Sequence, residues 1–328
     1  MTIRLGTRGS ALALAQSRLV ADAIASALAE PVELVQIVTD GDRSTAPVPE
    51  LGVGVFVSAL RDALAAKEID IAVHSYKDLP TAPVDGLVIA AVPPREDPRD
   101  VLISSGGRTL EQLPAGARIG TGAVRRVAQL RALRRDFECV PMRGNVDTRL
   151  RKLAEGRADA LVLAAAGLRR LGRAAEMTQV LDPETMLPAP AQGALAVECR
   201  CADHSLVERL RRIDDEHTRA AVTAERTLMA ALEAGCSAPV AALADVVDTV
   251  DGGLRVHVSA AVFAVDGTRA VRGRDTGPLS DAVGVGSRLA AQLLAAGADL
   301  LLGENPAPGA SLPSEKRTLH AGPKGDSA

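Results

Sequence analysis

The 328-residue chain is predicted to be an α/β protein, with two blocks of alternating strands and helices followed by a small α+β domain. Short β-branched runs alternate with amphipathic segments of helical length through both blocks. A proline-rich break at residues 93–98 separates the blocks, and a second break at residues 187–193 precedes a change of composition. A chain of this length can form two or three domains, each with its own core.

The first block predicts a mostly parallel sheet covered by helices. Ser10 is a good N-cap residue for its first helix. The expected elements are strands at residues 2–7, 32–38, 69–73 and 87–92, and helices at residues 11–29 and 55–66.

The second block repeats this architecture without repeating the sequence, and the third block differs from both. In the second block the expected elements are strands at residues 101–104, 118–120, 137–140 and 160–163, and helices at residues 124–133 and 146–155. The third block predicts helices at residues 215–234 and 279–294, and strands near Val240 and at residues 254–265 and 269–274. The tail from residue 303 is rich in Pro, Gly, Ser and charge, and is expected to be disordered.

Composition excludes several classes of function. A net charge of −3 disfavours a nucleic-acid partner, and one Tyr, three Phe and no Trp leave little surface for base stacking. No apolar stretch reaches the length of a membrane helix, and the N-terminus lacks a signal-peptide pattern, so a cytoplasmic protein is expected. The four cysteines have neither disulfide nor zinc spacing, and the scattered histidines predict no metal site.

Charged residues follow the ends of several predicted strands. Ligands bind at this edge of parallel α/β sheets, where helix N-termini offer free N–H groups. Exposure to solvent explains any single arginine there, but the set favours an anionic ligand, because guanidinium groups bind carboxylate or phosphate in bidentate fashion. The set comprises Arg8, Arg125, Arg126, Arg143 and Arg149.

Lys77 and Asp78 follow the third predicted strand. One interpretation is a surface ion pair in a turn, worth about 0–1 kcal/mol. The other is an ionised acid in a basic site, where it stabilises a developing cation.

Cys236 follows the long helix of the third block, after Gly235 as a helix C-cap. A free cysteine in this place is either a small buried apolar residue or, near arginines, a nucleophile or attachment point with a lowered pKa.

Taken together, these motifs resemble the porphobilinogen deaminase (hydroxymethylbilane synthase) family over residues 3–302. The resemblance is carried, in order, by Gly6-Thr7-Arg8 with Ser10, Gly41-Asp42, His74-Ser75-Tyr76-Lys77-Asp78-Leu79-Pro80, Arg125-Arg126, Arg143-Gly144-Asn145-Val146, Thr148-Arg149, Ala166-Gly167-Leu168, Leu187-Pro188-Ala189, Gln192-Gly193-Ala194 and Gly235-Cys236.

The resemblance implies a fold of two doubly wound lobes like those of periplasmic binding proteins, plus a small C-terminal α+β domain. It implies a discontinuous first domain (residues 1–96 and 190–212), a second domain (97–189) and a third (213–302), with the active site between the lobes. The segment near residues 193–202 is thereby expected to return to the first domain.

The resemblance also implies a reaction, namely stepwise head-to-tail condensation of four porphobilinogen molecules with loss of ammonia, then hydrolysis to hydroxymethylbilane. A dipyrromethane cofactor is expected on Cys236, with Asp78 and Lys77 as catalytic residues. Cofactor contacts are expected from Asp78, Lys77, Arg125, Arg126, Thr121 and Asn145. Substrate contacts are expected from Arg8, Ser10, Arg143, Arg149, Arg170, Gln192 and Phe56. A cytoplasmic monomer that passes its product to uroporphyrinogen-III synthase, and no metal, complete the expectation.

Four positions depart from the family pattern, of which Ala234, in place of a common glycine before Gly235-Cys236, should be tolerated. Gly122 and Ala123 replace common hydroxyl residues, and Val53 replaces a common lysine in a glycine-rich loop. Two other function classes remain open at this point. A non-catalytic, two-lobed carboxylate-binding or sensor module needs neither Cys236 nor Asp78, and a cysteine hydrolase would need a histidine partner that the sequence does not indicate.

Overall fold

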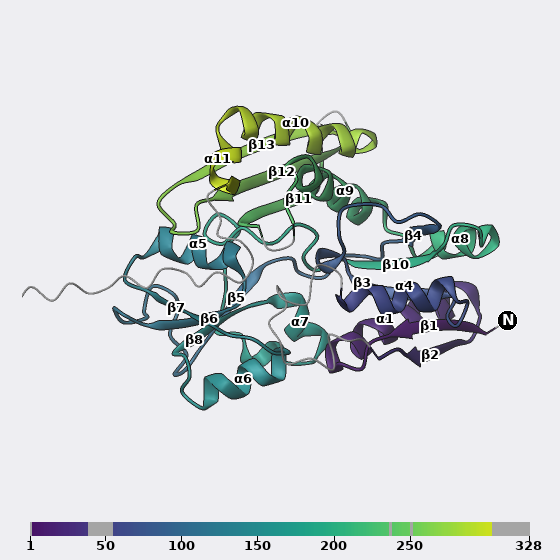
Figure 1. The fold of residues 1–328 in the computed structure, drawn as a ribbon, viewed down its shortest axis with the longest axis horizontal. Helices are drawn as coiled ribbons and strands as arrows, with labels where there is room; N and C mark the ends of the chain where they lie inside the picture. Colours follow the sequence, from purple (N-terminus) through teal and green to yellow (C-terminus); the bar gives the residue numbers. More distant parts are fainter. Residues whose placement is uncertain (1, 39–54, 236–237, 250–251, 304–328) are drawn as a thin grey trace, which may run out of the picture.

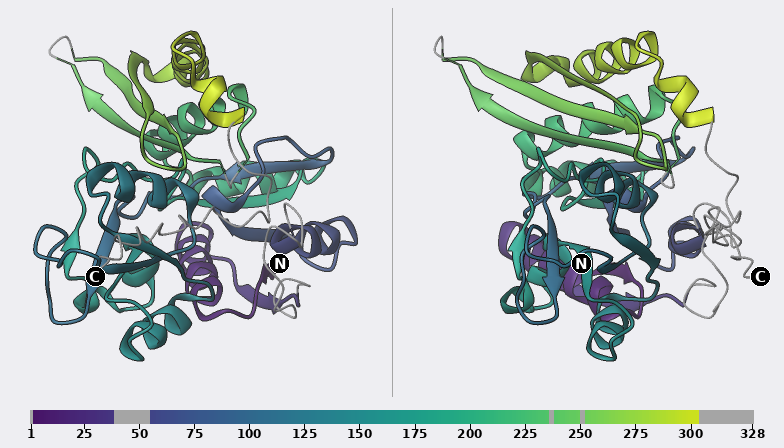
Figure 2. Two further views of the ribbon diagram at one scale, coloured as in Figure 1. Left: turned by 60° about the vertical axis from the view of Figure 1, so that its left-hand side comes forward. Right: turned by 90° about the vertical axis from the view of Figure 1, so that its left-hand side faces the viewer.

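The computed structural model describes residues 2–38, 55–235, 238–249 and 252–303 (Figure 1). Two lobes, each a five-stranded sheet covered by helices, lie side by side beneath a third domain, which has a three-stranded sheet and two long helices (Figures 1 and 2). The architecture is therefore mixed α/β with a small C-terminal α+β domain, as predicted. The precise domain bounds remain a prediction.

The first lobe is built on the strand order β2-β1-β3-β10-β4. Strands β1, β2 and β3 are parallel, whereas β10 is antiparallel to both of its neighbours. Helix α1 begins at the Ser10 cap, and its buried Val20 and Ile24 pack on the sheet. The bounds are β1 Ile3–Thr7, α1 Ala11–Leu28, β2 Val32–Gln36, α4 Val55–Ala65, β3 Ile71–Ser75, β4 Leu87–Ala91, β10 Leu195–Arg200 and α8 His204–Leu210.

The second lobe has the equivalent order β7-β6-β8-β5-β9. Here β6, β7 and β8 are parallel and β5 is the antiparallel strand. The bounds are β5 Asp100–Ser104, β6 Arg118–Thr121, α5 Val124–Leu133, β7 Glu138–Pro141, α6 Val146–Ala154, β8 Ala160–Ala164, α7 Ala165–Arg170 and β9 Gln179–Val180.

Two chain segments cross between the lobes. One leads from β4 to β5 and the other from β9 to β10, so each crossing delivers the antiparallel strand of the lobe that it enters. The crossings contact each other, since the Glu96 N–H donates to the Gly193 carbonyl at 3.2 Å.

The third domain packs helices on one face of its sheet and uses the other face for docking. Along β11 (Val240–Asp248), Ala242 and Ala244 face helices α9 (Glu216–Ala231) and α10 (Ala282–Ala295). The alternating Ala241 and Leu243 belong to a cluster with Ala128 of α5 and Leu187 of the second crossing. This period of two is that of a strand buried on both faces. The remaining elements are β12 Leu254–Phe263, β13 Ala270–Pro278 and α11 Ala298–Gly303.

Most predicted elements are confirmed within a few residues, with some differences. The third strand lies two residues later than predicted, because the extended chain continues through His74 and Ser75. The final helix begins at Ala282, after a 3₁₀ turn over residues 279–281. The pattern of residues alone did not indicate α7, β10 or α8. The expected disorder beyond residue 303 falls almost wholly outside the described residues.

The prediction that no apolar stretch reaches the length of a membrane helix was wrong in its literal form. Helix α1 is long and apolar enough, by length and composition, to meet the criterion for a membrane span. It packs against β1, β2 and β3 as a covering helix of the first sheet, which accounts for its apolar composition.

Candidate active site

In both sheets, the predicted site residues follow the carboxyl ends of the parallel strands, and these ends face the segments that cross between the lobes. In the first lobe, Arg8 follows β1 and Lys77 and Asp78 follow β3, its parallel neighbour, so all three lie at one sheet edge. In the second lobe, Arg143 follows β7, and α5 and α7 begin after β6 and β8. These are the carboxyl ends at which parallel sheets bind ligands.

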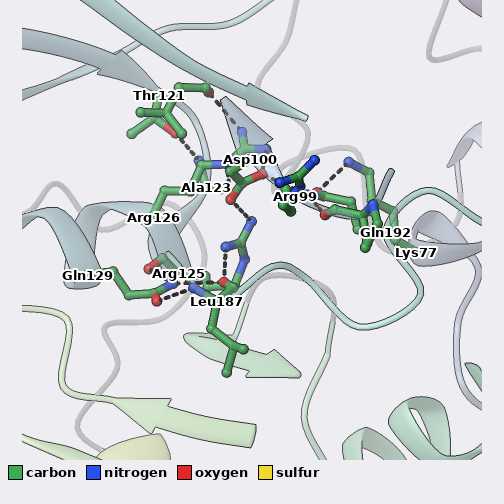
Figure 3. Close-up of polar contacts among 12 residues, drawn as sticks. Lys77, Arg99, Asp100, Thr121, Ala123, Arg125, Arg126, Gln129, Leu187 and Gln192 are labelled. Carbon is green, nitrogen blue, oxygen red and sulfur yellow. Dashed lines mark hydrogen bonds and ion pairs between the residues drawn. The ribbon is translucent and has the colours of Figure 1, made fainter. Parts of the chain in front are cut away.

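Asp100, the first residue of β5, is the centre of the polar cluster in Figure 3. Its fully buried carboxylate accepts hydrogen bonds from Nη2 of Arg125 at 2.9 Å and from Nη2 of Arg126 at 2.8 Å. Both arginines are themselves buried, and they also donate to the carbonyls of Leu187 and Val162. Burial alone would raise the pKa of Asp100, but the two guanidinium charges outweigh it, so that pKa lies well below its usual range.

Gln192 connects this cluster to the first lobe. Its Nε2 donates to Oδ1 of Asp100 at 2.7 Å, and its Oε1 accepts from Nζ of Lys77 at 3.2 Å (Figure 3). Lys77 keeps some solvent-accessible surface, yet protein atoms crowd its ammonium group. The resulting desolvation is the main reason that the pKa of Lys77 falls to about 8, and nearby Arg126 lowers it further against the opposing charge of Asp78.

Two more predicted arginines lie close to this cluster or to the crossings. Arg149 donates through Nε to the Gly144 carbonyl at 2.7 Å, and its charge interacts with Arg126 and Asp78. Arg170 donates to the Gly193 carbonyl at 2.6 Å. Desolvation lowers the pKa of each to about 10, which still leaves both guanidinium groups charged at neutral pH.

Other predicted site residues have local structural roles. Ser10 and Asn145 are the N-caps of α1 and α6, and their side-chain oxygens accept from Ala13 N–H at 3.3 Å and Thr148 N–H at 2.9 Å. Thr121 is buried and accepts from the Ala123 N–H at 3.3 Å. Arg8 is half-buried and Arg143 is exposed.

Three sequence-based predictions lie outside the described residues: Cys236, the side chain of Phe56, and Val53. Of the departures from the family pattern, Ala123 is the N-cap of α5 and supplies no capping oxygen. Among the residues that the structure describes, no group of three or more His, Cys, Asp or Glu could hold a metal ion. Cys139, Cys199 and Cys201 are free thiols, and burial raises the pKa of Cys199 to about 11.

The cluster has a surplus of positive charge. Six groups influence one another electrostatically, and four cations against two carboxylates leave a formal surplus of two. They are Lys77, Arg125, Arg126 and Arg149 against Asp78 and Asp100. Desolvated cations without full compensation are costly, so this site is suited to a dianion that restores the balance.

The sequence did not indicate that Asp100 belongs to the site. It stands at the start of a β-branched run, in Pro98-Arg99-Asp100, where it looks like an exposed strand-boundary residue. No local signal distinguishes it, because its partners are 25 to 92 residues away along the chain.

Two models of one protein family match most of the chain. A family model described as "Porphobilinogen deaminase, dipyromethane cofactor binding domain" matches residues 3–208, and one for the "Porphobilinogen deaminase, C-terminal domain" matches residues 219–295. Among solved structures, the methionine-binding protein MetQ covers 65% of this chain and 88% of its own, at 13% identity and a TM-score of 0.41.

Curated relatives match over most of their length. "Porphobilinogen deaminase" of Nocardia farcinica is 55% identical over 92% of this chain and 88% of its own. "Porphobilinogen deaminase 1" of Streptomyces coelicolor is 54% identical over 92% and 98%, and the Mycobacterium tuberculosis protein is 52% identical over the same shares. With both family models matched in order and more than half of its aligned residues shared with these relatives, the chain belongs to the porphobilinogen deaminase family.

Proposed function

We propose that this chain is a transferase, porphobilinogen deaminase. It joins four porphobilinogen molecules head to tail, releases ammonia at each step, and hydrolyses the product to hydroxymethylbilane for tetrapyrrole and haem synthesis. The names of its relatives support this function, and neither those names nor the family models favour a non-catalytic binding module.

The observation that carries the proposal is the cationic cluster beside Asp78. Each porphobilinogen has an acetate and a propionate, so each ring brings two carboxylates. Arg125, Arg126 and Lys77 supply charge-assisted donors in a partly desolvated setting, where such hydrogen bonds are strong. The surplus of two positive charges fits a dicarboxylate ring.

The same donors fit the dipyrromethane group that the matched family model names. We infer that Lys77, Arg125, Arg126 and Arg149 hold its carboxylates, with Thr121 and Asn145 nearby, and that Cys236 carries it through a thioether. When bound, this group supplies the pyrrole carbon to which the first substrate ring is joined. A thioether is stable to repeated turnover, which suits an anchor that is kept when the product leaves.

Asp78 is the proposed catalytic carboxylate. Loss of ammonia from the aminomethyl group of porphobilinogen leaves a cationic electrophile, and a fixed carboxylate near the pyrrole N–H lowers the free energy of that cation and its transition state. Lys77, next to it, orients the acid or binds a substrate carboxylate. Arg8, Ser10, Arg143, Arg149, Arg170, Gln192 and Phe56 are the proposed contacts to the growing chain.

Intact-protein mass spectrometry tests the cofactor assignment. We expect the purified wild-type protein to carry an added mass equal to two pyrrole units, and Cys236→Ser to lack it, while Cys201→Ser, at an exposed thiol, keeps it. An unmodified wild-type protein that still forms hydroxymethylbilane would contradict the assignment.

Asp78→Asn tests the catalytic role. Asp78 is exposed, so the amide should fold normally. It removes the charge that stabilises the cation, and turnover of porphobilinogen, followed as ammonia release, should fall by about 10²-fold or more. Normal turnover by the folded variant would remove Asp78 from this role.

Two further parts of the proposal concern the protein's setting. We propose a cytoplasmic monomer that passes hydroxymethylbilane to uroporphyrinogen-III synthase. Light scattering on the purified chain tests the monomer, and a coupled assay with that enzyme tests whether the released product is its substrate.

A further inference from the structure

The loop that carries Asp78 is held from outside its own lobe. Residues 76–78 form one 3₁₀ turn after β3, and the chain leaves that turn through Leu79 and Pro80. Within the described part of the chain, no hydrogen bond or ion pair fixes the Asp78 carboxylate itself, although its charge interacts with those of Lys77 and Arg149. The direction of that carboxylate therefore depends on the backbone of this turn.

Arg226, on helix α9 of the third domain, binds that backbone. Its Nη1 donates to the carbonyls of Tyr76 at 3.2 Å and Leu79 at 3.0 Å, and its Nη2 donates to the carbonyl of Pro80 at 2.7 Å. The guanidinium also stacks over the ring of Tyr76, with 4.4 Å between the guanidinium carbon and the ring centroid. One planar group thus contacts the turn on both sides of Asp78.

This geometry depends on a guanidinium. Its rigid fork presents several N–H groups in one plane and stacks on an aromatic face, whereas a lysine offers one compact ammonium group. Tyr76 is the only tyrosine in the sequence, and it provides the stacking face beside Lys77 and Asp78.

The first lobe supplies the remaining constraints on the turn. The Tyr76 N–H donates to the Ala194 carbonyl at 3.0 Å, at the start of β10. The side chain of Leu79 is buried with Val57 and Ala196. These contacts hold the two ends of the turn to the lobe, while Arg226 of the third domain binds the carbonyls of Tyr76, Leu79 and Pro80.

We propose that Arg226 is a positioning residue for catalysis, through which the third domain sets the location of Asp78. The proposal rests on the function proposed above, in which Asp78 is the catalytic carboxylate. Helix α9 ends at Ala231, five residues before Cys236, so the helix that holds the catalytic turn also leads into the segment of the proposed cofactor anchor. One helix of the third domain is thereby in direct contact with the turn that carries the acid.

Arg219 provides a matched control on the same helix. It forms an ion pair with Asp214 at 2.7 Å and donates to the Ala90 carbonyl at 3.1 Å, at the end of β4. It therefore also joins α9 to a backbone carbonyl of the first lobe, but away from the turn. If replacing an arginine acts only by weakening the docking of the domains, both Arg226→Ala and Arg219→Ala should lower kcat. If it acts by displacing the turn, only Arg226→Ala should lower kcat.

The experiment compares Arg226→Ala, Arg226→Lys and Arg219→Ala as full-length protein carrying the cofactor. For Arg226→Ala we expect kcat for ammonia release to fall by about 10- to 100-fold, because a displacement of about 1 Å costs this much, while KM changes less than about threefold. Arg226→Lys should recover only part of the loss. Arg219→Ala should keep kcat within about threefold of wild type, whatever its melting temperature.

A second measurement does not depend on activity. Hydrogen exchange of the peptide covering residues 75–80 should become faster in both Arg226 variants and stay unchanged in Arg219→Ala. Should Arg226→Ala fail to fold, Arg226→Lys carries the test alone, and wild-type kcat with wild-type exchange in that variant would overturn the proposal. Equal loss of kcat in Arg219→Ala would also overturn it, because docking would then be the common cause.

The outcome is distinguishable from failure of the proposed function. An inactive Asp78→Asn together with a fully active Arg226→Ala rejects the positioning role alone. An active Asp78→Asn rejects the catalytic role of Asp78, and with it the premise for Arg226.

Discussion

At the scale of single residues, the site depends on a carboxylate that is not expected to touch the substrate. Asp100 lies between Arg125 and Arg126 and neutralises one of their two charges, which allows both guanidinium groups to be buried. A buried pair without a counter-charge would be strongly unfavourable. The position of the arginines after a strand predicted their role from the sequence. Asp100 could not be predicted in this way, because its partners lie far from it along the chain and leave no local pattern around it.

The depressed pKa of Lys77 predicts a pH limit on substrate capture. Desolvation lowers this pKa from its usual 10.5 to about 8, so the ammonium group is charged at neutral pH and loses its charge as the pH rises through about 8. If the charge binds a substrate carboxylate, kcat/KM should fall by roughly tenfold for each pH unit above the pKa, because kcat/KM reports the free enzyme. Steady-state assays between about pH 6.5 and 9.5 measure this limb.

Two variants test whether Lys77 causes the alkaline fall in kcat/KM. Arg stays charged across this range, so Lys77→Arg should show a flat alkaline profile, even if its kcat/KM is lower throughout. Lys67→Arg, at an exposed lysine in the first lobe, should keep the wild-type profile. A wild-type profile that is flat to pH 9.5, or a limb that persists in Lys77→Arg, would contradict the assignment.

At the scale of elements, local patterns predicted most of the strands and helices, whatever their partners in the sheets. They did not indicate β10, because its strand pattern is interrupted by a buried charge. Glu198 lies in the middle of β10 and is held by Nη2 of Arg61 at 2.8 Å, with His74 at 3.2 Å. The resemblance to a family, not periodicity, indicated that this segment returns to the first domain. The placement of β10 between β3 and β4 is a property of the tertiary fold.

The turn before β10 predicts a large effect of a small substitution. Gly193 has φ +89°, and a Cβ there would lie 2.2 Å from the carbonyl oxygen of Glu96. Gly193→Ala therefore combines left-handed strain with a backbone clash between the two crossings, and we expect it to lower the free energy of unfolding by about 3 kcal/mol or more. Thermal and urea unfolding followed by circular dichroism measure the loss.

Gly156 separates the two contributions to that loss. It has a similar φ of +72°, but nothing lies within 4 Å of its Cβ position. Gly156→Ala should cost only the strain, about 1–2 kcal/mol. Equal losses in the two variants would show that the close approach of the crossings is unimportant.

At the scale of the whole molecule, one buried carboxylate joins the third domain to both of the segments that cross between the lobes. Glu225, on α9 next to Arg226, accepts from Nη1 of Arg95 at 2.7 Å in the first crossing. It also accepts from the N–H of Ala191 in the second crossing and from the N–H of Ala244 in β11 at 2.7 Å. The third domain therefore contacts both segments that cross between the lobes.

Glu225→Gln tests whether this junction supports the assembled molecule. The amide keeps the shape of the side chain but removes the charge opposite Arg95, whose side chain is only 10% exposed. An uncompensated buried guanidinium costs about 3–5 kcal/mol, so the midpoint of urea unfolding should fall clearly.

Glu184→Gln is the matched control, because Glu184 pairs with Arg274 across another domain boundary at exposures of 74% and 58%. Such a surface pair contributes about 0–1 kcal/mol, and its loss should leave the midpoint nearly unchanged. Similar small shifts in both variants would mean that the crossings are held by apolar packing, such as the contact of Leu187 with Ala241, and not by Glu225.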